Sequence, residues 1–221
     1  MQDPEGQAGT SAGKTAGAAL PVDARHADKA AWRASLLAAR GAMGTEDRAA
    51  AARSIRDALL TLPEVEMAAS IAAYASLRSE PDTGGLLFAL WKRGTYVLLP
   101  RVLPDRDLDW ATYEGPDSLV PGPYGLLQPT AEARGVRAVE AADVVIVPSL
   151  AVDRTGVRLG RGGGSYDRAL ARVGPQILTV GLVYDAELVE ALPSAPHDQR
   201  LRAVVTPSGG FHRFPGTRPA T

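Results

Sequence analysis

The sequence predicts an α/β fold with three layers, in which a mostly parallel sheet carries helices on both faces. Short continuous Val/Ile/Leu segments, of which 143–148 is the clearest, are typical of strands buried on both faces. Amphipathic helical segments separate these strands, as expected of parallel strands joined by helical crossovers. With 221 residues, 45% of them hydrophobic, the chain can bury a core without covalent cross-links. We therefore expect one α/β domain over residues 26–210, an N-terminal tail over 1–25 and a C-terminal tail over 211–221.

Helices and strands are predicted to alternate along this domain. A first helix over 26–40 places Trp32, Leu36 and Leu37 on one side and ends at Gly41. A second helix begins at Thr45 as its N-cap. The segment 108–113 alternates polar and apolar residues, so it is predicted to be antiparallel or peripheral. Further strands are expected at 69–74, 95–100, 143–148, 157–159, 177–184 and 201–206. Further helices are expected from Asp82 or Thr83 to Gly94, from the glycines at 160–164 to Arg172, and near 185–192.

Composition excludes several classes of function. The chain has 24 basic and 25 acidic residues, so its formal net charge of −1 provides no overall attraction to nucleic acid or to an anionic membrane. Because it has no cysteine, disulfides, thiolate metal sites and a cysteine nucleophile are excluded. The three histidines are too dispersed for a three-histidine zinc site. With no membrane-length apolar run and no signal-peptide pattern, we expect a cytoplasmic protein.

The segment from Arg158 to Arg168 is the strongest functional signal. It holds four glycines within five residues, between a predicted strand and a predicted helix, together with three arginines. Backbone N–H groups of such a loop can surround an anion without obstruction from side chains. The segment matches neither a Walker P-loop nor a dinucleotide fingerprint. The alternative interpretation is a flexible turn with solvated arginines.

Acidic and basic residues elsewhere extend this hypothesis to a nucleotide with a metal ion. A carboxylate at Asp167 beside a phosphate requires a bridging cation, for which Mg²⁺ is the natural choice. Asp198 is a second candidate ligand, although an ordinary loop aspartate beside a surface histidine is an equal alternative for it. Lys29 and Arg33 lie four residues apart and project from one helix face, although a solvated basic face is an alternative for them. In the loop after strand 69–74, Glu80 can accept hydrogen bonds from a polar heterocycle. Two tyrosines, Tyr124 and Tyr166, can stack on a flat ring or pack in the core.

The segment VPSLAVDRTGVRLGRGGGSYDRAL resembles the signature of the 5-formyltetrahydrofolate cyclo-ligase family. Further segments are similar to the same family in the same order over roughly residues 27–209. These are Lys29 to Arg33, YASLRSEPDT, LLPRV, GPYGLLQP and VGLVYDAELVEALPSAPHD.

The resemblance implies an ATP-dependent, Mg²⁺-requiring ring closure of 5-formyltetrahydrofolate to 5,10-methenyltetrahydrofolate, with ADP and phosphate released. ATP phosphorylates the formyl oxygen, and N10 then attacks the activated carbon. This chemistry uses cations and backbone amides around a phosphoryl group and requires no protein nucleophile. The implied fold is similar to that of the sugar-phosphate isomerase and coenzyme A transferase group. The implied partners are ATP and a reduced folate, with no nucleic acid or membrane, and we expect a monomer.

The resemblance also assigns roles to positions of this chain. Asp167 and Asp198 correspond to metal ligands, and Arg161 and Tyr166 are the predicted catalytic residues. The predicted folate contacts are Glu80, Tyr124 and Gly162 to Tyr166. The predicted ATP contacts are Lys29, Arg33, Leu159, Gly160, Arg161, Gly162, Gly163, Gly164, Ser165, Tyr166 and Asp167.

Three features depart from the family pattern. Ser165 stands where many members have tyrosine, Arg202 where an acidic residue is common, and the N-terminal tail is additional.

Two other hypotheses about the function stay open from the sequence. One is a sugar-phosphate isomerase-like enzyme that shares the anion loop, and the other is a non-catalytic folate- or nucleotide-binding regulator.

Overall fold

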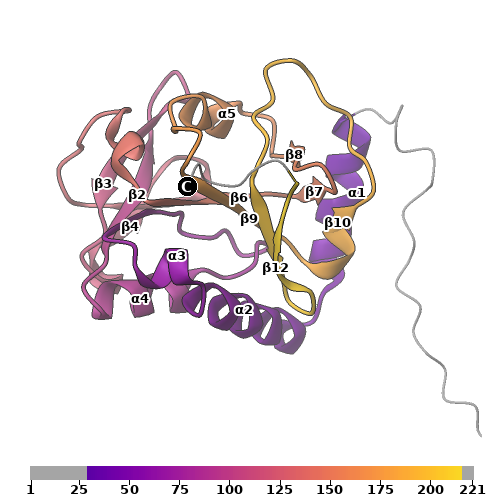
Figure 1. Cartoon of the computed structure of the whole chain (residues 1–221), viewed down its shortest axis with the longest axis horizontal. Coiled ribbons are helices and arrows are strands. Elements are labelled where there is room, and N and C mark those ends of the chain that lie inside the picture. The colour runs from indigo at the N-terminus through magenta and orange to yellow at the C-terminus, as the bar shows by residue number, and fades with distance from the viewer. Residues whose placement is uncertain (1–28, 216–221) are drawn as a thin grey trace, which may run out of the picture.

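The computed structural model describes residues 29–215 and is built around a seven-stranded sheet (Figure 1). The five inner strands pair in parallel, and an antiparallel strand closes each edge. The predicted tail over 1–25, His26 and residues 216–221 lie outside the described residues. In spatial order the strands are β12 (Gly210–Arg213), β11 (Ala203–Thr206), β9 (Leu178–Leu182), β6 (Val144–Pro148), β1 (Ser70–Ala72), β2 (Tyr96–Val102) and β3 (Leu108–Thr112).

One face of this sheet is covered by three helices. They are α2 (Thr45–Leu60), α3 (Pro63–Glu66) and α4 (Gly84–Lys92), which lie side by side beneath the sheet in Figure 1. Their apolar side chains, such as Ile55 and Leu90, pack on alternate residues of the inner strands. This burial explains the continuous apolar strand sequences, since both faces of each inner strand are covered.

The other face carries shorter elements. They are α5 (Ser165–Leu170) and the 3-10 turn η4 (Ala138–Ala141), which share a second apolar cluster with Trp110 and Phe214. The hairpin of β4 (Leu119–Pro121) and β5 (Leu127–Pro129) carries two further 3-10 turns, η2 (Pro116–Ser118) and η3 (Pro123–Gly125). Helix α5 is shorter than the sequence predicts, since it ends at Leu170 and not at Arg172.

At one end of the sheet, helix α1 (Lys29–Ala42) packs on a small second sheet. This sheet consists of β7 (Ala151–Asp153), β8 (Arg158–Leu159) and β10 (Leu188–Val189), the last of which follows the 3-10 turn η5 (Asp185–Glu187). Trp32 and Leu36 face it and form a third apolar cluster with Leu150 and Leu159. Helix α1 is thereby fixed beside the strand β8 that leads into the glycine-rich segment.

The structure confirms the antiparallel edge position predicted for 108–113 and corrects several local predictions. Helix α1 continues through Gly41 to Ala42, and Leu37 is 36% exposed. Thr45 is the first residue of α2 and not its cap, since the N-cap position is Gly44. Residues 185–192 form a 3-10 turn followed by β10, where a helix was expected.

The sheet also extends past the predicted domain end at residue 210. Residues 211–213 of strand β12 lie in the segment that was predicted to be a tail over 211–221. This segment is part of the fold, because β12 pairs with β11 and Phe214 beyond it is buried. Within residues 29–215, none of the helices has the length and apolar character required to cross a membrane.

Candidate functional site

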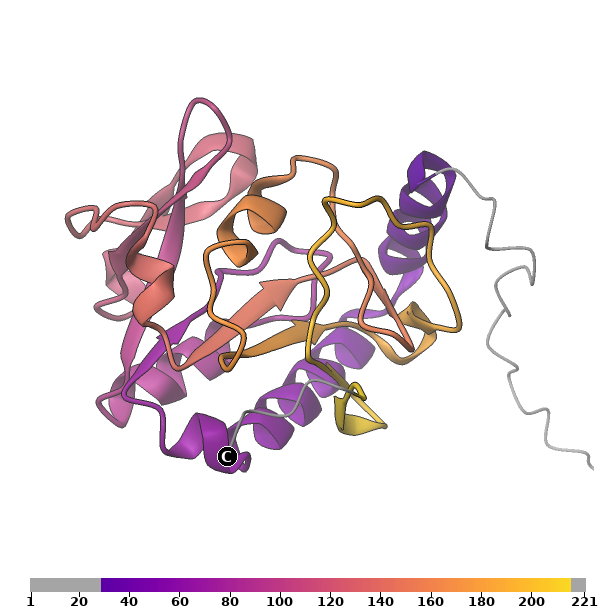
Figure 2. The ribbon, with the colours of Figure 1, turned by 45° about the horizontal axis from the view of Figure 1, so that its top comes forward.

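A pocket of about 780 Å³ opens at the carboxyl ends of the inner strands. It extends from α1 at one end of the sheet to the β2–β3 and β4–β5 connections at the other, with α5 between them (Figures 1 and 2). All of the predicted site residues contribute to its lining: Lys29, Arg33, Glu80, Tyr124, Leu159 to Asp167, and Asp198. Residues from five separate segments of the sequence are therefore gathered in one cavity.

The glycine-rich segment 160–164 joins β8 to α5 and forms one wall of the pocket. Gly162 and Gly164 have φ values of +97° and +69°, a region that other residues rarely adopt. Arg33 packs against this turn, where its Nε donates a hydrogen bond of 2.8 Å to the Gly160 carbonyl. Among residues 29–215, no backbone N–H of 160–164 donates to a protein acceptor. These amides are available to an anionic ligand, as expected of a phosphate-binding loop.

Three ion pairs line the pocket, and two of them join a basic group to a carboxylate from a distant part of the chain. Such pairs hold charged side chains in fixed positions while leaving their other oxygens and nitrogens for a ligand. They are Lys29 Nζ with Asp198 Oδ2 at 2.6 Å, Arg158 Nη2 with Asp167 Oδ1 at 3.0 Å, and Arg161 Nε with Glu80 Oε1 at 3.1 Å.

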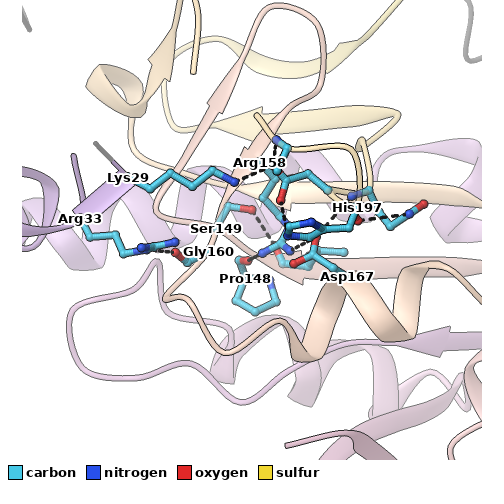
Figure 3. A network of polar contacts seen from close by, with 12 residues as sticks. Lys29, Arg33, Pro148, Ser149, Arg158, Gly160, Asp167 and His197 are labelled. Atoms are coloured by element: carbon cyan, nitrogen blue, oxygen red, sulfur yellow. Dashed lines mark hydrogen bonds and ion pairs between the residues drawn. The ribbon is translucent and has the colours of Figure 1, made fainter. Parts of the chain in front are cut away.

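Asp167 lies in the first turn of α5, beside Arg158 (Figure 3). The buried guanidinium of Arg158 holds its carboxylate, and the backbone N–H of Gln199 donates to the same oxygen at 3.3 Å. Arg158 also donates to the Pro148 carbonyl at 3.5 Å, so it connects β8 to the end of β6. Asp167 is therefore positioned by two neighbouring segments.

Asp198 is held in the same part of the pocket by α1. Besides Lys29, the backbone N–H of Ala195 donates to its carboxylate at 2.7 Å, and His197 Nε2 lies 3.7 Å from Oδ1. Burial raises the pKa of Asp198, but Lys29 and the Ala195 N–H outweigh this effect and hold that pKa below its usual value. Asp198 is therefore ionised near neutral pH.

These two carboxylates are the candidate metal ligands within the pocket. Residues 29–215 contain no group of three or more His, Asp or Glu side chains that would enclose a metal ion. The donor set instead fits Mg²⁺, which is commonly bound by one or two carboxylates together with phosphate oxygens and water. A metal at this site would depend on a bound nucleotide for its remaining ligands.

Glu80 and two buried tyrosines occupy the floor of the pocket. The side chain of Glu80 is 7% exposed, and it accepts the Leu77 backbone N–H at 2.8 Å in addition to Arg161. The hydroxyl oxygens of Tyr74 and Tyr166 are buried without a hydrogen-bond partner in the described chain. Burial, reinforced by the charge of Glu80, raises the pKa of both tyrosines, so they stay protonated and able to donate.

Tyr124 lies at the mouth of the pocket, on the turn between β4 and β5. Its side chain is 67% exposed, and the guanidinium of Arg106 lies 5.9 Å from the centre of its ring. Leu126 and Leu127 continue the apolar wall on the same hairpin. This end of the pocket offers flat and apolar surfaces, in contrast to the charged end near α1.

Several lining residues were not assigned a role from the sequence, among them Tyr74, Arg106, Ser149 and His197. Ser149 directly follows β6, so the rule that ligands bind at the carboxyl ends of parallel strands would have found it. Arg106 lies in a turn between two strands and carries no sequence signal of its own. Its place in the pocket depends on how the β2–β3 hairpin folds over the sheet.

Comparison with known proteins gives a consistent result. A family model described as the 5-formyltetrahydrofolate cyclo-ligase family matches residues 25–207. A 5-formyltetrahydrofolate cyclo-ligase of Mycolicibacterium smegmatis is 38% identical over 147 residues, which cover 64% of this chain and 75% of the relative. The enzyme of the same name from Escherichia coli is 38% identical over 153 residues, covering 68% of this chain and 84% of the relative.

A solved structure is similar over most of the chain. The NMR structure of a 5,10-methenyltetrahydrofolate synthetase from Aquifex aeolicus superposes with a TM-score of 0.75 at 28% sequence identity. The superposition covers 87% of this chain and 96% of that protein. The likeness therefore extends to the α/β architecture as a whole.

Proposed function

Since this chain belongs to the 5-formyltetrahydrofolate cyclo-ligase family, we propose that it catalyses the ATP-dependent closure of 5-formyltetrahydrofolate to 5,10-methenyltetrahydrofolate. One observation carries the proposal beyond the family likeness. The pocket has a charged end with free loop amides beside α1, and an aromatic and apolar end beside β4 and β5. A nucleotide and a flat heterocycle can therefore occupy one cavity next to each other.

The charged end has the groups that a triphosphate requires. The amides of 160–164 and the cations Lys29 and Arg33 can surround the phosphate oxygens, and Arg161, which is paired with Glu80, belongs to the same loop. Arg161 is therefore placed to stabilise charge on a phosphoryl group in transfer. We retain Asp167 and Asp198 as the residues that would hold Mg²⁺, which would neutralise phosphate charge when bound.

The proposed reaction proceeds in two steps without a protein nucleophile. The formyl oxygen attacks the γ-phosphorus of ATP, the bond to the bridging oxygen breaks, and ADP leaves. The lone pair of N10 then attacks the activated formyl carbon, and N10 loses its proton. The carbon–oxygen bond breaks to release phosphate, which carries the former formyl oxygen and can take up that proton. The protein contributes alignment and electrostatic stabilisation, which are the main sources of catalysis in phosphoryl transfer.

The folate end of the pocket supports the roles proposed for Glu80, Tyr124 and Tyr166. Glu80 can accept hydrogen bonds from the N–H groups of a pterin, and the exposed ring of Tyr124 can lie on a flat ring. The buried hydroxyl of Tyr166 lacks a partner in the described chain, so a substrate atom would satisfy it.

Further parts of the proposal concern the chain as a whole. We propose that the layered sheet is related to the sugar-phosphate isomerase and coenzyme A transferase group, with one catalytic domain that begins near residue 26. We further propose that the protein acts as a cytoplasmic monomer on small molecules, without nucleic acid or membrane partners.

The direct test is the absorbance band of 5,10-methenyltetrahydrofolate after purified protein is mixed with 5-formyltetrahydrofolate, ATP and Mg²⁺. The band should grow only with all components present, and removal of Mg²⁺ by a chelator should stop it. Asp167→Asn should lower the rate about 100-fold, whereas Asp117→Asn removes an exposed carboxylate outside the pocket and should leave it unchanged. Folded protein that never produces the band would refute the proposal.

A further inference from the structure

The end of the pocket remote from α1 is closed by two connections, the β2–β3 turn and the β4–β5 hairpin. Figures 1 and 2 show both at the opposite end of the sheet from α1. Apolar side chains line this end, including Val102, Leu108 and Leu126, and one basic residue, Arg106, stands among them.

Arg106 and Tyr124 share an unusual backbone conformation. They are the two non-glycine residues with positive φ in the described chain, at +65° and +60°. Both line the pocket, and the Arg106 guanidinium stacks over the Tyr124 ring at 5.9 Å. Positive φ disfavours residues with a Cβ, and such strain is concentrated at functional sites. Two residues in this conformation therefore lie together at one end of the pocket, as expected of a functional site.

The charge of Arg106 is also uncompensated, in contrast to most cations of the pocket. Lys29, Arg158 and Arg161 each have a carboxylate partner. Within residues 29–215, Arg106 has no carboxylate within ion-pair distance, and its recorded side-chain contact is the face of Tyr124. A cation that is supported by an aromatic ring and lacks a carboxylate is suited to bind an anionic group of a ligand.

Neighbouring side chains hold the turn without neutralising Arg106. Arg168 of α5 donates to the Arg106 carbonyl at 2.6 Å, and so fixes the turn against that helix. The carboxylate of Asp107 accepts two hydrogen bonds from the guanidinium of Arg172, at 2.9 and 2.5 Å. The carboxylate of Asp105 accepts the backbone N–H of Asp107 at 2.9 Å. The Arg106 side chain is therefore presented on an ordered turn.

We propose that Arg106 binds a carboxylate of the glutamate tail of the folate substrate, and thereby sets the preference of the pocket for glutamylated over unglutamylated forms. This inference rests on the proposed function. A reduced folate carries its negative charges at the glutamate, separated from the pterin by a flat aminobenzoyl group. The apolar wall of Val102, Leu108 and Leu126 fits that group, and Arg106 stands beside it.

The test compares binding of 5-formyltetrahydrofolate with that of 5-formyltetrahydropteroate, which lacks the glutamate, by titration calorimetry on the full chain. The native protein should bind the glutamylated form about five- to tenfold more tightly. Arg106→Gln should abolish this difference by weakening only the glutamylated form, and Arg106→Lys should restore most of it. Arg134→Gln is the matched control, since Arg134 is an exposed arginine stacked on Tyr96 outside the pocket.

Two results would overturn the proposal. If Arg106→Gln weakens both ligands equally, Arg106 acts through Tyr124 and not on the glutamate. If it weakens neither, Arg106 has no part in binding. Binding and turnover are measured separately, so that the two proposals can fail independently. A glutamate preference lost in Arg106→Gln, in a protein without turnover, would support the carboxylate site and contradict the proposed reaction.

Discussion

The buried ion pair between Arg40 and Glu187 connects α1 to the rest of the molecule, and replacing Arg40 by methionine should destabilise the fold strongly. The two side chains are 1% and 5% exposed, and they share two hydrogen bonds of 2.6 and 2.8 Å. Arg40 also donates to the Ser149 carbonyl at 2.7 Å. The pair therefore links helix α1, which carries Lys29, to the loop after β6 in the pocket.

The expected magnitude follows from what Arg40→Met leaves behind. The Glu187 carboxylate would still accept the hydrogen bond of 2.8 Å from the Tyr184 backbone N–H, but it would be left buried without a counter-charge. Breaking a buried pair on one side costs about 3–5 kcal/mol, a large part of a typical stability of about 5–15 kcal/mol. Replacing both partners, as in Arg40→Met with Glu187→Leu, removes the stranded charge and should recover at least about half of the loss.

The assay is urea unfolding at pH 7, followed by circular dichroism, for the native protein and the single and double variants. Arg53→Met is the control, because Arg53 is an exposed arginine on α2, and it should change stability by less than about 0.5 kcal/mol. The reasoning is refuted if Arg40→Met costs less than about 1 kcal/mol, or if the effects of the Arg40 and Glu187 replacements simply add.

Two further predictions concern positions that shape the pocket from outside. The hydrogen bond from Arg172 lowers the pKa of Asp107 in the folded protein. The ionised Asp107 carboxylate therefore contributes its full stabilisation above the unfolded pKa of about 3.9, and this stabilisation is lost as pH falls through the folded pKa. Asp107→Asn should therefore cost about 1–2 kcal/mol in urea unfolding at pH 7, and this cost should shrink progressively as pH falls below about 3.9; a cost that does not change with pH would contradict this. Gly156→Ala should cost more than about 3 kcal/mol, because φ is +84° and the new Cβ would lie 2.3 Å from the Leu201 carbonyl oxygen. Gly135→Ala, at φ +91° in open space, should lower the free energy of unfolding by only about 1 kcal/mol. Both variants are measured by urea unfolding, and similar losses for the two would contradict the steric argument.

The glycine-rich segment was predictable from sequence because its signal is local. Four glycines after a strand permit a loop whose backbone can approach an anion, and Gly162 and Gly164 use the positive φ that glycine allows. Asp167 was identified by its position beside this loop. The inner strands were equally clear, since burial on both faces gives continuous apolar sequences such as that of β6.

Other features depended on tertiary contacts that no local pattern encodes. The partner of Lys29 is Asp198, 169 residues away, and Arg161 pairs with Glu80 across 81 residues. The segment 185–192 was mistaken for a helix because its apolar residues suit either period, whereas in the fold Leu188 pairs with Val152 of the small sheet. Sequence reasoning thus identified which residues carry charge and left open how those charges are paired.

The central claim is that ATP activates the formyl oxygen inside this pocket, and isotopic labelling tests it most directly. The substrate is 5-formyltetrahydrofolate with ¹⁸O in its formyl group, incubated with the protein, ATP and Mg²⁺ in ordinary water. Because the formyl oxygen attacks phosphorus and then leaves with it, the released phosphate should carry the ¹⁸O label in a one-to-one ratio with the methenyl product. Unlabelled phosphate accompanied by methenyl product would contradict the phosphorylated intermediate.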